Sequence, residues 1–348
     1  MKAAVLHAFN QDLAYEDVAD PQITDPHDVI VRIGAAGLCR TDLHIHEGQF
    51  EAAQKDAGLS LPYTPGHENA GWVQEVGSAV TNVAVGDTVI VHPLITCGLC
   101  LACRAGDDMH CEIGVFPGLF APGGMAEYLK TSARSVVKLE PGTQPADVAA
   151  LADAGLTAYH AVKKAVPLLY PGTKALVIGA GGLGHIGIQC LRALTATEII
   201  VMDRSAAALE LARASGADHT VQVQADGSHV EQVRELTKGK GAEVVIDFVG
   251  EGGAEADGVA LLRPAGTYYV IGYGGAIHVP TMQIILTEIN FVGNLVGTYN
   301  DLAELMVLTQ QGRVKLHTST YPLADVNRAI ADLTAGRLVG RGILVPAG

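Results

Sequence analysis

Basic residues are scarce in this sequence of 348 residues: 23 lysines and arginines stand against 37 aspartates and glutamates, a formal net charge of −14. No basic run offsets this acidity, which excludes a surface built to bind nucleic-acid phosphates. No apolar stretch approaches the roughly 20 residues of a membrane-spanning helix. The first residues carry acidic side chains and lack the apolar core of a secretory signal, so we expect a cytoplasmic protein.

Aromatic residues make up only 5% of the chain, but hydrophobic residues make up 49%, which is ordinary for a globular protein and excludes a mostly disordered one. The length is too large for one compact core and predicts two domains. The sequence shows no internal repeat, low-complexity tract or linker. The two domains are therefore expected to share an interface rather than a flexible tether.

The pattern of the sequence changes near residue 150. Before it, β-branched runs bounded by glycine and proline predict strands at 29–37, 70–77 and 87–94. After it, apolar runs alternate with helical patterns, which predicts a doubly wound parallel sheet. The expected strands of that sheet begin at 174, 198, 243 and 267. The fold class is therefore α/β, with a β-rich first part.

A glycine-rich turn follows the first of these strands. Gly179, Gly181 and Gly184 form G-x-G-x-x-G between a strand and a helix, and Asp203 ends the next strand 24 residues after Gly179. This context predicts a dinucleotide site, with the pyrophosphate at the helix N-terminus and Asp203 on the adenosine ribose. Asp203 favours NAD over NADP, although the neighbouring Arg204 could contact a 2′-phosphate. A turn without ligand, another adenine nucleotide and a methyl-donor cofactor are the alternatives.

Cysteines are few, but four of the six lie within one fifteen-residue window. In a reducing compartment this clustering indicates a metal more than disulfides. The spacing suits a closed tetrahedral zinc site of structural type, with an iron–sulfur cluster as the main rival. The four residues are Cys97, Cys100, Cys103 and Cys111.

A second set of ligand types is spread along the chain. Cys39 follows a predicted strand, His67 lies in a loop after two prolines, and Asp153 precedes a helical stretch. Together they would supply sulfur, nitrogen and oxygen ligands and leave one position open, as a catalytic zinc requires.

Four segments in this order resemble the zinc-dependent medium-chain alcohol dehydrogenase family: GLCRTD, PGHENAGWVQEVG, the cysteine cluster and VIGAGGLGHIG. The resemblance extends over essentially the whole chain. It implies a GroES-like, β-rich catalytic domain made of residues 1–153 and 299–348, and a Rossmann domain for NAD made of residues 154–298. It also implies two zinc ions per chain.

The same resemblance implies roles for individual residues. Cys39, His67 and Asp153 match the catalytic zinc ligands, although the third is usually a cysteine in the family. Glu68 matches a residue that can approach this zinc during ligand exchange. Asp42 matches the partner of the histidine ligand, and Thr41 and His44 match the proton relay. The residues matched or predicted for the cofactor site are Gly179, Gly181, Gly182, Leu183, Gly184, Asp203, Arg204, Arg40, Thr157 and Arg341.

The function that these patterns favour is hydride transfer between a primary or secondary alcohol and NAD, or reduction of a ketone or aldehyde in reverse. Aliphatic residues in segments 92–96 and 294–300 favour an apolar substrate. A polyol or amino-acid dehydrogenase of the same family and, further off, a zinc-free quinone reductase-like protein are the alternatives. A homo-oligomer is expected, a tetramer rather than a dimer, with no nucleic-acid or membrane partner.

Overall fold

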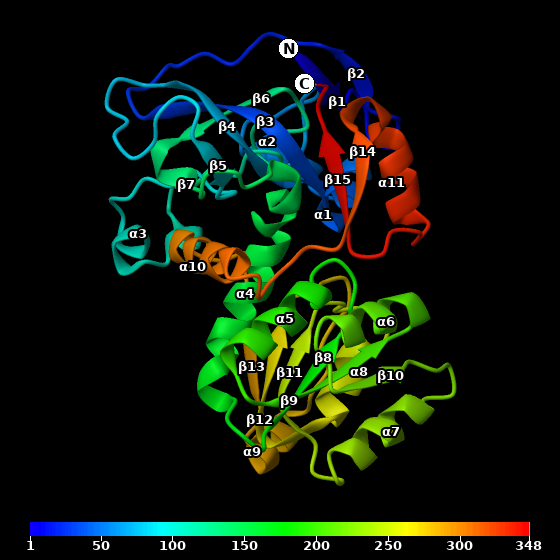
Figure 1. The fold of residues 1–348 in the computed structure, drawn as a ribbon. Helices are drawn as coiled ribbons and strands as arrows, with labels where there is room; N and C mark the ends of the chain where they lie inside the picture. Colours follow the sequence, from blue (N-terminus) through cyan, green and yellow to red (C-terminus); the bar gives the residue numbers. More distant parts are fainter. Residues whose placement is uncertain (348) are drawn as a thin grey trace. The chain divides into compact units, whose positions relative to one another are not determined.

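The computed structural model describes residues 1–347, and the chain divides into two compact units. Of the described residues, unit 1 contains 1–156, 298–310 and 316–347, so that it is built from N-terminal and C-terminal segments of the sequence. Unit 2 contains residues 157–297 and 311–315. Figure 1 shows the blue N-terminal strands and the red C-terminal strand β15 within unit 1.

Unit 1 is organised around a seven-stranded, mostly antiparallel sheet. Its strand order is β14-β15-β3-β4-β5-β7, with β6 paired to β3, and only β14 and β15 run parallel. β1 and β2 form a separate two-stranded sheet. The strands are β1 Lys2–Val5, β2 Ala14–Asp17, β3 Asp28–Leu38, β4 Glu68–Val76, β5 Thr88–Val91, β6 Tyr128–Ser132, β7 Val136–Lys138, β14 Thr318–Pro322 and β15 Arg341–Val345.

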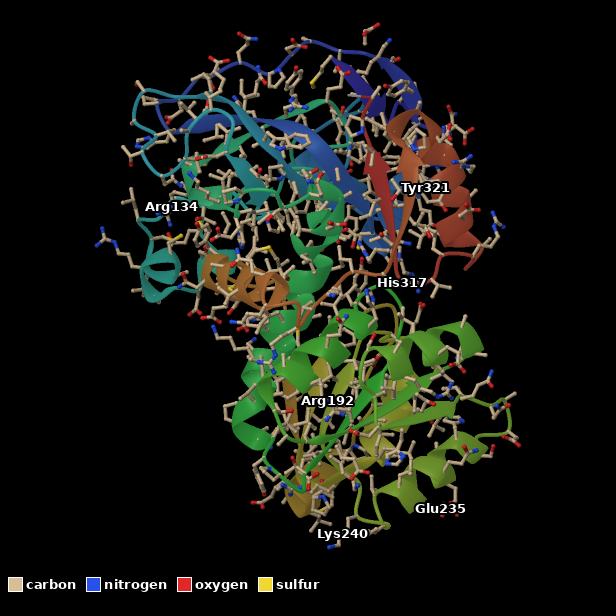
Figure 2. All side chains as sticks on the ribbon, viewed as in Figure 1. Arg134, Arg192, Glu235, Lys240, His317 and Tyr321 are labelled. Carbon is tan, nitrogen blue, oxygen red and sulfur yellow. The ribbon has the colours of Figure 1, made fainter. Side chains whose placement is uncertain are left out.

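Five α-helices belong to the described residues of unit 1, and α11 packs against β14 and β15. The helices of unit 1 are α1 Arg40–His46, α2 Glu51–Asp56, α3 Leu101–Ala105, α10 Tyr299–Gln310 and α11 Val326–Thr334. Single 3₁₀ turns lie at Asp108–His110, Ala133–Ser135, Pro145–Asp147, Ala149–Leu151 and Leu323–Asp325. β14 contributes the buried Tyr321, labelled in Figure 2, to a core shared with β3, β4 and β5.

Unit 2 is the predicted doubly wound parallel sheet. Its six strands follow the order β10-β9-β8-β11-β12-β13, all parallel. The apolar residues of β8 are fully buried because helices cover both faces of such a sheet. The strands are β8 Lys174–Ile178, β9 Glu198–Asp203, β10 His219–Gln222, β11 Ala242–Asp247, β12 Leu262–Val270 and β13 Asn290–Gly293.

Helices follow the strands of unit 2 in alternation. Ser205 caps α6 because its hydroxyl accepts a hydrogen bond from the Ala208 amide. The α-helices are α4 Ala154–Ala165, α5 Gly184–Leu194, α6 Ala206–Ala214, α7 Ser228–Leu236, α8 Ala254–Ala260 and α9 Thr281–Thr287, and Val166–Leu168 forms a 3₁₀ turn. The first three residues of α4 belong to unit 1.

The predicted strands differ from the observed ones mainly at their ends. The strand expected at 267–275 is β12, which begins earlier, at Leu262, and ends at Val270, before a bend at Gly274 and Gly275. β10 and β13 are short, and the sequence pattern did not predict them. Within residues 1–347 no helix is long and apolar enough to cross a membrane.

Candidate functional site

Four side chains from distant parts of unit 1 meet at one point. One ligand atom from each of Cys39, His67, Glu68 and Asp153 lies within 4.8 Å of the others. Cys39 follows β3, His67 directly precedes β4, whose first residue is Glu68, and Asp153 immediately precedes α4. The antiparallel pairing of β3 with β4 places Gly37 opposite Glu68, and this register brings Cys39 close to His67.

His67 is at the centre of this group and is only 1% exposed. Its Nε2 lies 3.4 Å from Asp153 Oδ2, and its Nδ1 lies 3.3 Å from Asp42 Oδ1. Both ring nitrogens lack a hydrogen-bond partner of good geometry, as does the buried Asp153 Oδ1. Buried polar atoms without partners are costly, and a bound zinc ion would satisfy His67 Nε2 and Asp153 Oδ1, while Nδ1 faces Asp42. The donor set of sulfur, imidazole and carboxylate therefore fits zinc.

The charge around His67 also favours a cation. Burial opposes the charged imidazolium, but the carboxylates of Asp42 and Asp153 prevail and raise the pKa of His67 well above its ordinary value. Asp42 is itself fixed, because its Oδ2 accepts a hydrogen bond of 2.8 Å from the Cys39 amide. Asp42 thus lies where it can orient both Cys39 and the His67 ring.

Glu68 is fully buried, and each of its two carboxylate oxygens binds a different partner. Oε1 accepts a hydrogen bond of 3.0 Å from the Ala154 amide, next to Asp153. Oε2 forms an ion pair with Arg341, which is 4% exposed on β15. The structure thus places the Arg341 guanidinium against Glu68; the resemblance had assigned it to the cofactor pyrophosphate.

Besides Asp42, three predicted residues that follow Cys39 lie on α1. Thr41 is half-buried, and its Oγ1 lies 3.7 Å from Cys39 Sγ. His44 is also half-buried, three residues further along, so Thr41 and His44 share one face of the helix. Arg40 is exposed at the first position of the helix.

The glycine turn of unit 2 joins β8 to α5. A side chain at Gly184 would overlap the Gly179 carbonyl oxygen, whereas the space around Gly181 is open. Asp203, at the end of β9, reaches this turn because its Oδ2 accepts a hydrogen bond of 2.7 Å from the Ala180 amide. β8 lies between β9 and β11, where the strand order reverses, and doubly wound sheets bind their ligands at this point.

Of the other predicted cofactor residues in unit 2, Gly182 and Leu183 belong to this turn, Arg204 follows β9, and Thr157 lies on α4. Arg204 is exposed, and its Nη2 donates a hydrogen bond of 2.8 Å to the Gly252 carbonyl oxygen. Leu183 precedes the first turn of α5 and is half-buried, as is Gly182. Thr157 is buried on α4.

The four clustered cysteines converge around α3. Their sulfur atoms all lie within 4.8 Å of one another, which is a spacing that one tetrahedral zinc can bridge. Backbone amides already point at the sulfurs: the Leu99 and Cys100 amides each lie 3.3 Å from Cys97 Sγ. These hydrogen bonds lower the pKa of Cys97 to about 6, which favours the thiolate that binds metal.

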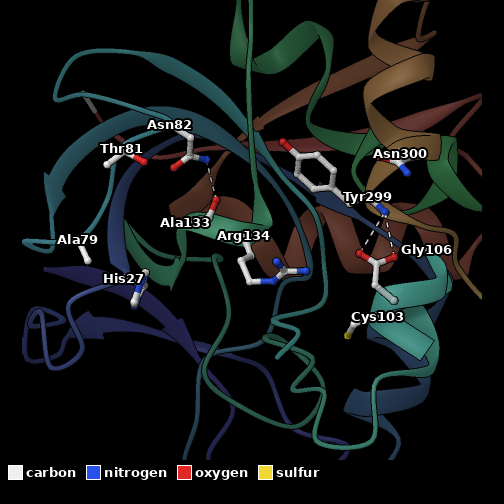
Figure 3. Close-up of a pocket in the computed structure, with 11 residues that line it drawn as sticks. His27, Ala79, Thr81, Asn82, Cys103, Gly106, Ala133, Arg134, Tyr299 and Asn300 are labelled. Atoms are coloured by element: carbon white, nitrogen blue, oxygen red, sulfur yellow. Dashed lines mark hydrogen bonds between the residues drawn. The ribbon is translucent and has the colours of Figure 1, made fainter. Parts of the chain in front are cut away.

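A cavity of about 510 Å³ lies beside this cysteine group (Figure 3). Arg134 and Cys103 line it, together with Asp108, whose carboxylate accepts hydrogen bonds from the Tyr299 amide. These contacts join the cysteine-rich segment to α10 within unit 1. The cavity is separate from the Cys39–His67–Asp153 group and shares no lining residue with it.

Sequence reasoning missed three groups that hold the predicted residues in place. The Ala154 amide binds Glu68, the Ala180 amide binds Asp203, and Gly37 makes room beside Glu68. The two amides carry no sequence signal, because every residue except proline has one. Gly37 has a signal, since it is a glycine inside a predicted strand, which indicates close approach of another group.

Comparison with known proteins gives two family matches that cover most of the chain. Residues 25–141 match the alcohol dehydrogenase GroES-like domain, and residues 182–311 match the zinc-binding dehydrogenase domain. These matches agree with the predicted fold class of a GroES-like domain combined with a Rossmann domain.

Full-length relatives are also known. The chain is 35% identical to an NAD-dependent alcohol dehydrogenase of Sulfurisphaera tokodaii, covering 99% of this chain and 100% of that protein. It is likewise 35% identical to a D-arabinose 1-dehydrogenase (NADP(+)) of Saccharolobus solfataricus, covering 99% of this chain and 97% of that protein. The solved structure of an alcohol dehydrogenase from Aeropyrum pernix is similar with a TM-score of 0.95 at 45% identity, over 99% of this chain and 100% of that one.

Proposed function

This chain belongs to the zinc-binding alcohol dehydrogenase family, and on that premise we propose that it oxidises an alcohol with NAD at a zinc ion held by Cys39, His67 and Asp153. The enzyme is an NAD-dependent alcohol dehydrogenase, which reduces the matching ketone or aldehyde in reverse. The observation that carries the assignment is His67, whose two ring nitrogens are buried without hydrogen-bond partners between Asp42 and Asp153.

Zinc, when bound, lowers the pKa of the alcohol, and NAD accepts the hydride that the alcohol carbon releases. Cys39, His67 and Asp153 would hold this zinc ion and leave room in its coordination shell for the substrate oxygen. Asp42 keeps the His67 ring in one orientation, because its carboxylate faces Nδ1 while the zinc-binding Nε2 faces Asp153.

The proton of the alcohol must leave a buried position. Thr41 is the group that we propose to accept the hydrogen bond from the substrate oxygen, because its hydroxyl lies next to the Cys39 ligand. His44 lies on the same face of α1 and takes the proton onward, since histidine titrates near neutral pH.

The cofactor is proposed to bind at the carboxyl end of the parallel sheet of unit 2. The amides at the start of α5 receive the pyrophosphate beside Gly181 and Gly182. Asp203 accepts hydrogen bonds from the adenosine ribose and repels a 2′-phosphate, which favours NAD over NADP. Arg40 and Arg341 are proposed as pyrophosphate contacts and Thr157 as a nicotinamide contact, following the family pattern; Arg341 would keep its ion pair with Glu68.

Metal analysis combined with a substrate screen tests this function. We expect about two zinc ions per chain, and formation of NADH with primary or secondary alcohols. A chain that holds no zinc, or a zinc-loaded chain that oxidises none of the alcohols tested, would contradict the proposal. The screen includes polyols and aldoses with NAD and NADP, because one relative is named as a D-arabinose dehydrogenase that uses NADP.

We also propose that the chain forms a homo-oligomer, a tetramer rather than a dimer, and acts in the cytoplasm. Helix α9 exposes Met282, Ile285 and Leu286, which are 62%, 69% and 75% exposed. It directly precedes β13, the last strand on one side of the parallel sheet. An apolar helix beside a sheet edge is a surface that a second copy of the chain could cover.

A further inference from the structure

Gly37 occupies a central place in the sheet of unit 1. It lies on β3, directly opposite Glu68 on β4 and opposite Ile343 on β15. The residue is buried and lies two positions before Cys39. Residues of three strands therefore meet beside the proposed zinc ligands.

The ion pair between Glu68 and Arg341 crosses β3 at this glycine. Side chains alternate between the two faces of a sheet, so a residue two positions from Ile343 shares its face. Arg341 is that residue, and Glu68 shares the face because it lies opposite Gly37. The two charged side chains therefore meet above Gly37, where Glu68 Oε2 lies.

Gly37 has no room for a side chain. A Cβ atom there would overlap Glu68 Oε2, the oxygen that binds Arg341, and would lie 2.9 Å from Glu68 Cβ. The backbone of Gly37 does not have a positive φ angle, so alanine could adopt its conformation. The missing side chain is therefore required for space and not for backbone freedom.

We propose that Gly37 is a positioning residue that keeps the Glu68 carboxylate on Arg341 and the Ala154 amide, outside the zinc coordination shell. This inference rests on the proposed zinc site. The ligand atom of Glu68 is already within 4.8 Å of those of Cys39, His67 and Asp153. A carboxylate displaced from Arg341 would bind the metal and fill the position that the substrate needs.

The test is Gly37→Ala in enzyme whose catalytic zinc is replaced by cobalt(II) while the cysteine cluster keeps its zinc. A carboxylate oxygen entering the coordination shell changes the visible absorption spectrum of cobalt. We expect this change in Gly37→Ala, together with a fall in kcat of about 10-fold or more, the range seen when groups behind metal ligands are altered. KM is expected to change less than kcat.

Two further variants separate this role from a general disturbance of the sheet. Gly34→Ala lies on the same strand and would crowd Pro145 and Trp72, with contacts of 2.6 and 2.7 Å, away from Glu68. It is expected to retain the wild-type cobalt spectrum. In the Glu68→Ala background, adding Gly37→Ala should leave the spectrum of Glu68→Ala unchanged, because the displaced carboxylate is gone.

An unchanged cobalt spectrum in Gly37→Ala would overturn the proposal, and so would the same spectral change with Glu68 absent. If Gly37→Ala does not fold, Arg341→Met is tested instead. This variant frees the Glu68 carboxylate because it removes the guanidinium that binds Oε2. It must produce the same spectral change, and an unchanged spectrum there contradicts the proposal. Wild-type enzyme without a metal at Cys39, His67 and Asp153 would instead contradict the proposed function.

Discussion

At the scale of single residues, the site depends on which side chains are left without a protein partner. Most buried polar atoms in this chain are hydrogen-bonded, as protein interiors require. The ring nitrogens of His67 and one oxygen of Asp153 are exceptions. His67 Nε2 and Asp153 Oδ1 belong to the group that also contains Cys39, and they are atoms of the kind that a zinc ion would bind.

Asp153 is the least usual ligand of the proposed set, and its removal is a direct test. Asp153→Ala should lose the catalytic zinc and keep the zinc of the cysteine cluster, because the two groups share no residue. Metal analysis should therefore fall from about two zinc ions per chain to about one, with activity lost. Asp147→Ala, an exposed carboxylate a short distance upstream, should retain both ions. Two ions per chain in Asp153→Ala would rule out its role as a ligand.

Asp203 is proposed to determine the choice of cofactor. Asp203→Ala removes an acceptor for the ribose hydroxyls and the charge that repels a 2′-phosphate. A hydrogen bond to a charged group is worth about 1.5–3 kcal/mol, so kcat/KM with NAD should fall about 10-fold to 100-fold. The value with NADP should fall less or rise. Asp226→Ala, in a loop of the same unit, is the control; equal losses with both cofactors in Asp203→Ala would contradict the assignment.

At the scale of elements, β3 organises unit 1. This eleven-residue strand pairs with β4, β6 and β15 and leads directly to Cys39. Its first residue, Asp28, also fixes the preceding turn, since its carboxylate accepts hydrogen bonds from the Thr24 and Asp25 amides. The charged carboxylate of Asp28 therefore stabilises the turn that leads into the strand.

This charge makes the stability of the turn depend on pH. Burial opposes ionisation of Asp28, but the hydrogen bonds from Thr24 and Asp25 prevail and lower its pKa. A lowered pKa in the folded state stabilises the protein above the unfolded value of about 3.9, and this stabilisation is lost as pH falls through the folded pKa. Asp28→Asn should therefore lower the melting temperature at pH 7, by an amount equivalent to about 1–2 kcal/mol.

The measurement for Asp28→Asn is a series of melting temperatures between neutral and acidic pH. The difference from the wild type should shrink towards zero as the Asp28 carboxylate becomes protonated in both states of the wild-type chain. Asp12→Asn, an exposed residue between β1 and β2, should follow the wild type throughout. A difference that stays constant with pH would show that the charge of Asp28 is not the cause.

At the scale of the whole molecule, helix α9 places several apolar residues in solvent. Leu286 is 75% exposed on α9, next to the edge strand β13. If this surface joins copies of the chain, Leu286→Glu should shift the protein to a smaller species in light scattering coupled to size-exclusion chromatography. Val85→Glu changes a residue 65% exposed in unit 1 and should leave the assembly unchanged. A wild-type elution profile for Leu286→Glu would exclude α9 from the interface.

Two kinds of information in the sequence, local spacing and resemblance to a family, predicted the family and the fold class, and they supplied the candidate residues of the site. The glycine turn and the cysteine cluster are local: their residues are close in the chain, so spacing alone constrains what they can bind. Cys39, His67 and Asp153 are far apart in the sequence, and spacing could not join them. Their assignment depended on the resemblance of the segments around them, and their roles remain predictions for the experiments above.

Only the tertiary structure decided how the charged groups around these ligands are arranged. Arg341 reaches Glu68 because β15, near the end of the chain, pairs with β3 beside β4. The sequence determined which chemical groups exist, since residue types and local spacing are fixed along the chain. It could not determine that Arg341 binds Oε2 of Glu68, or that Gly37 must lack a side chain. Those facts follow from strand register, and register is set by pairing between distant segments.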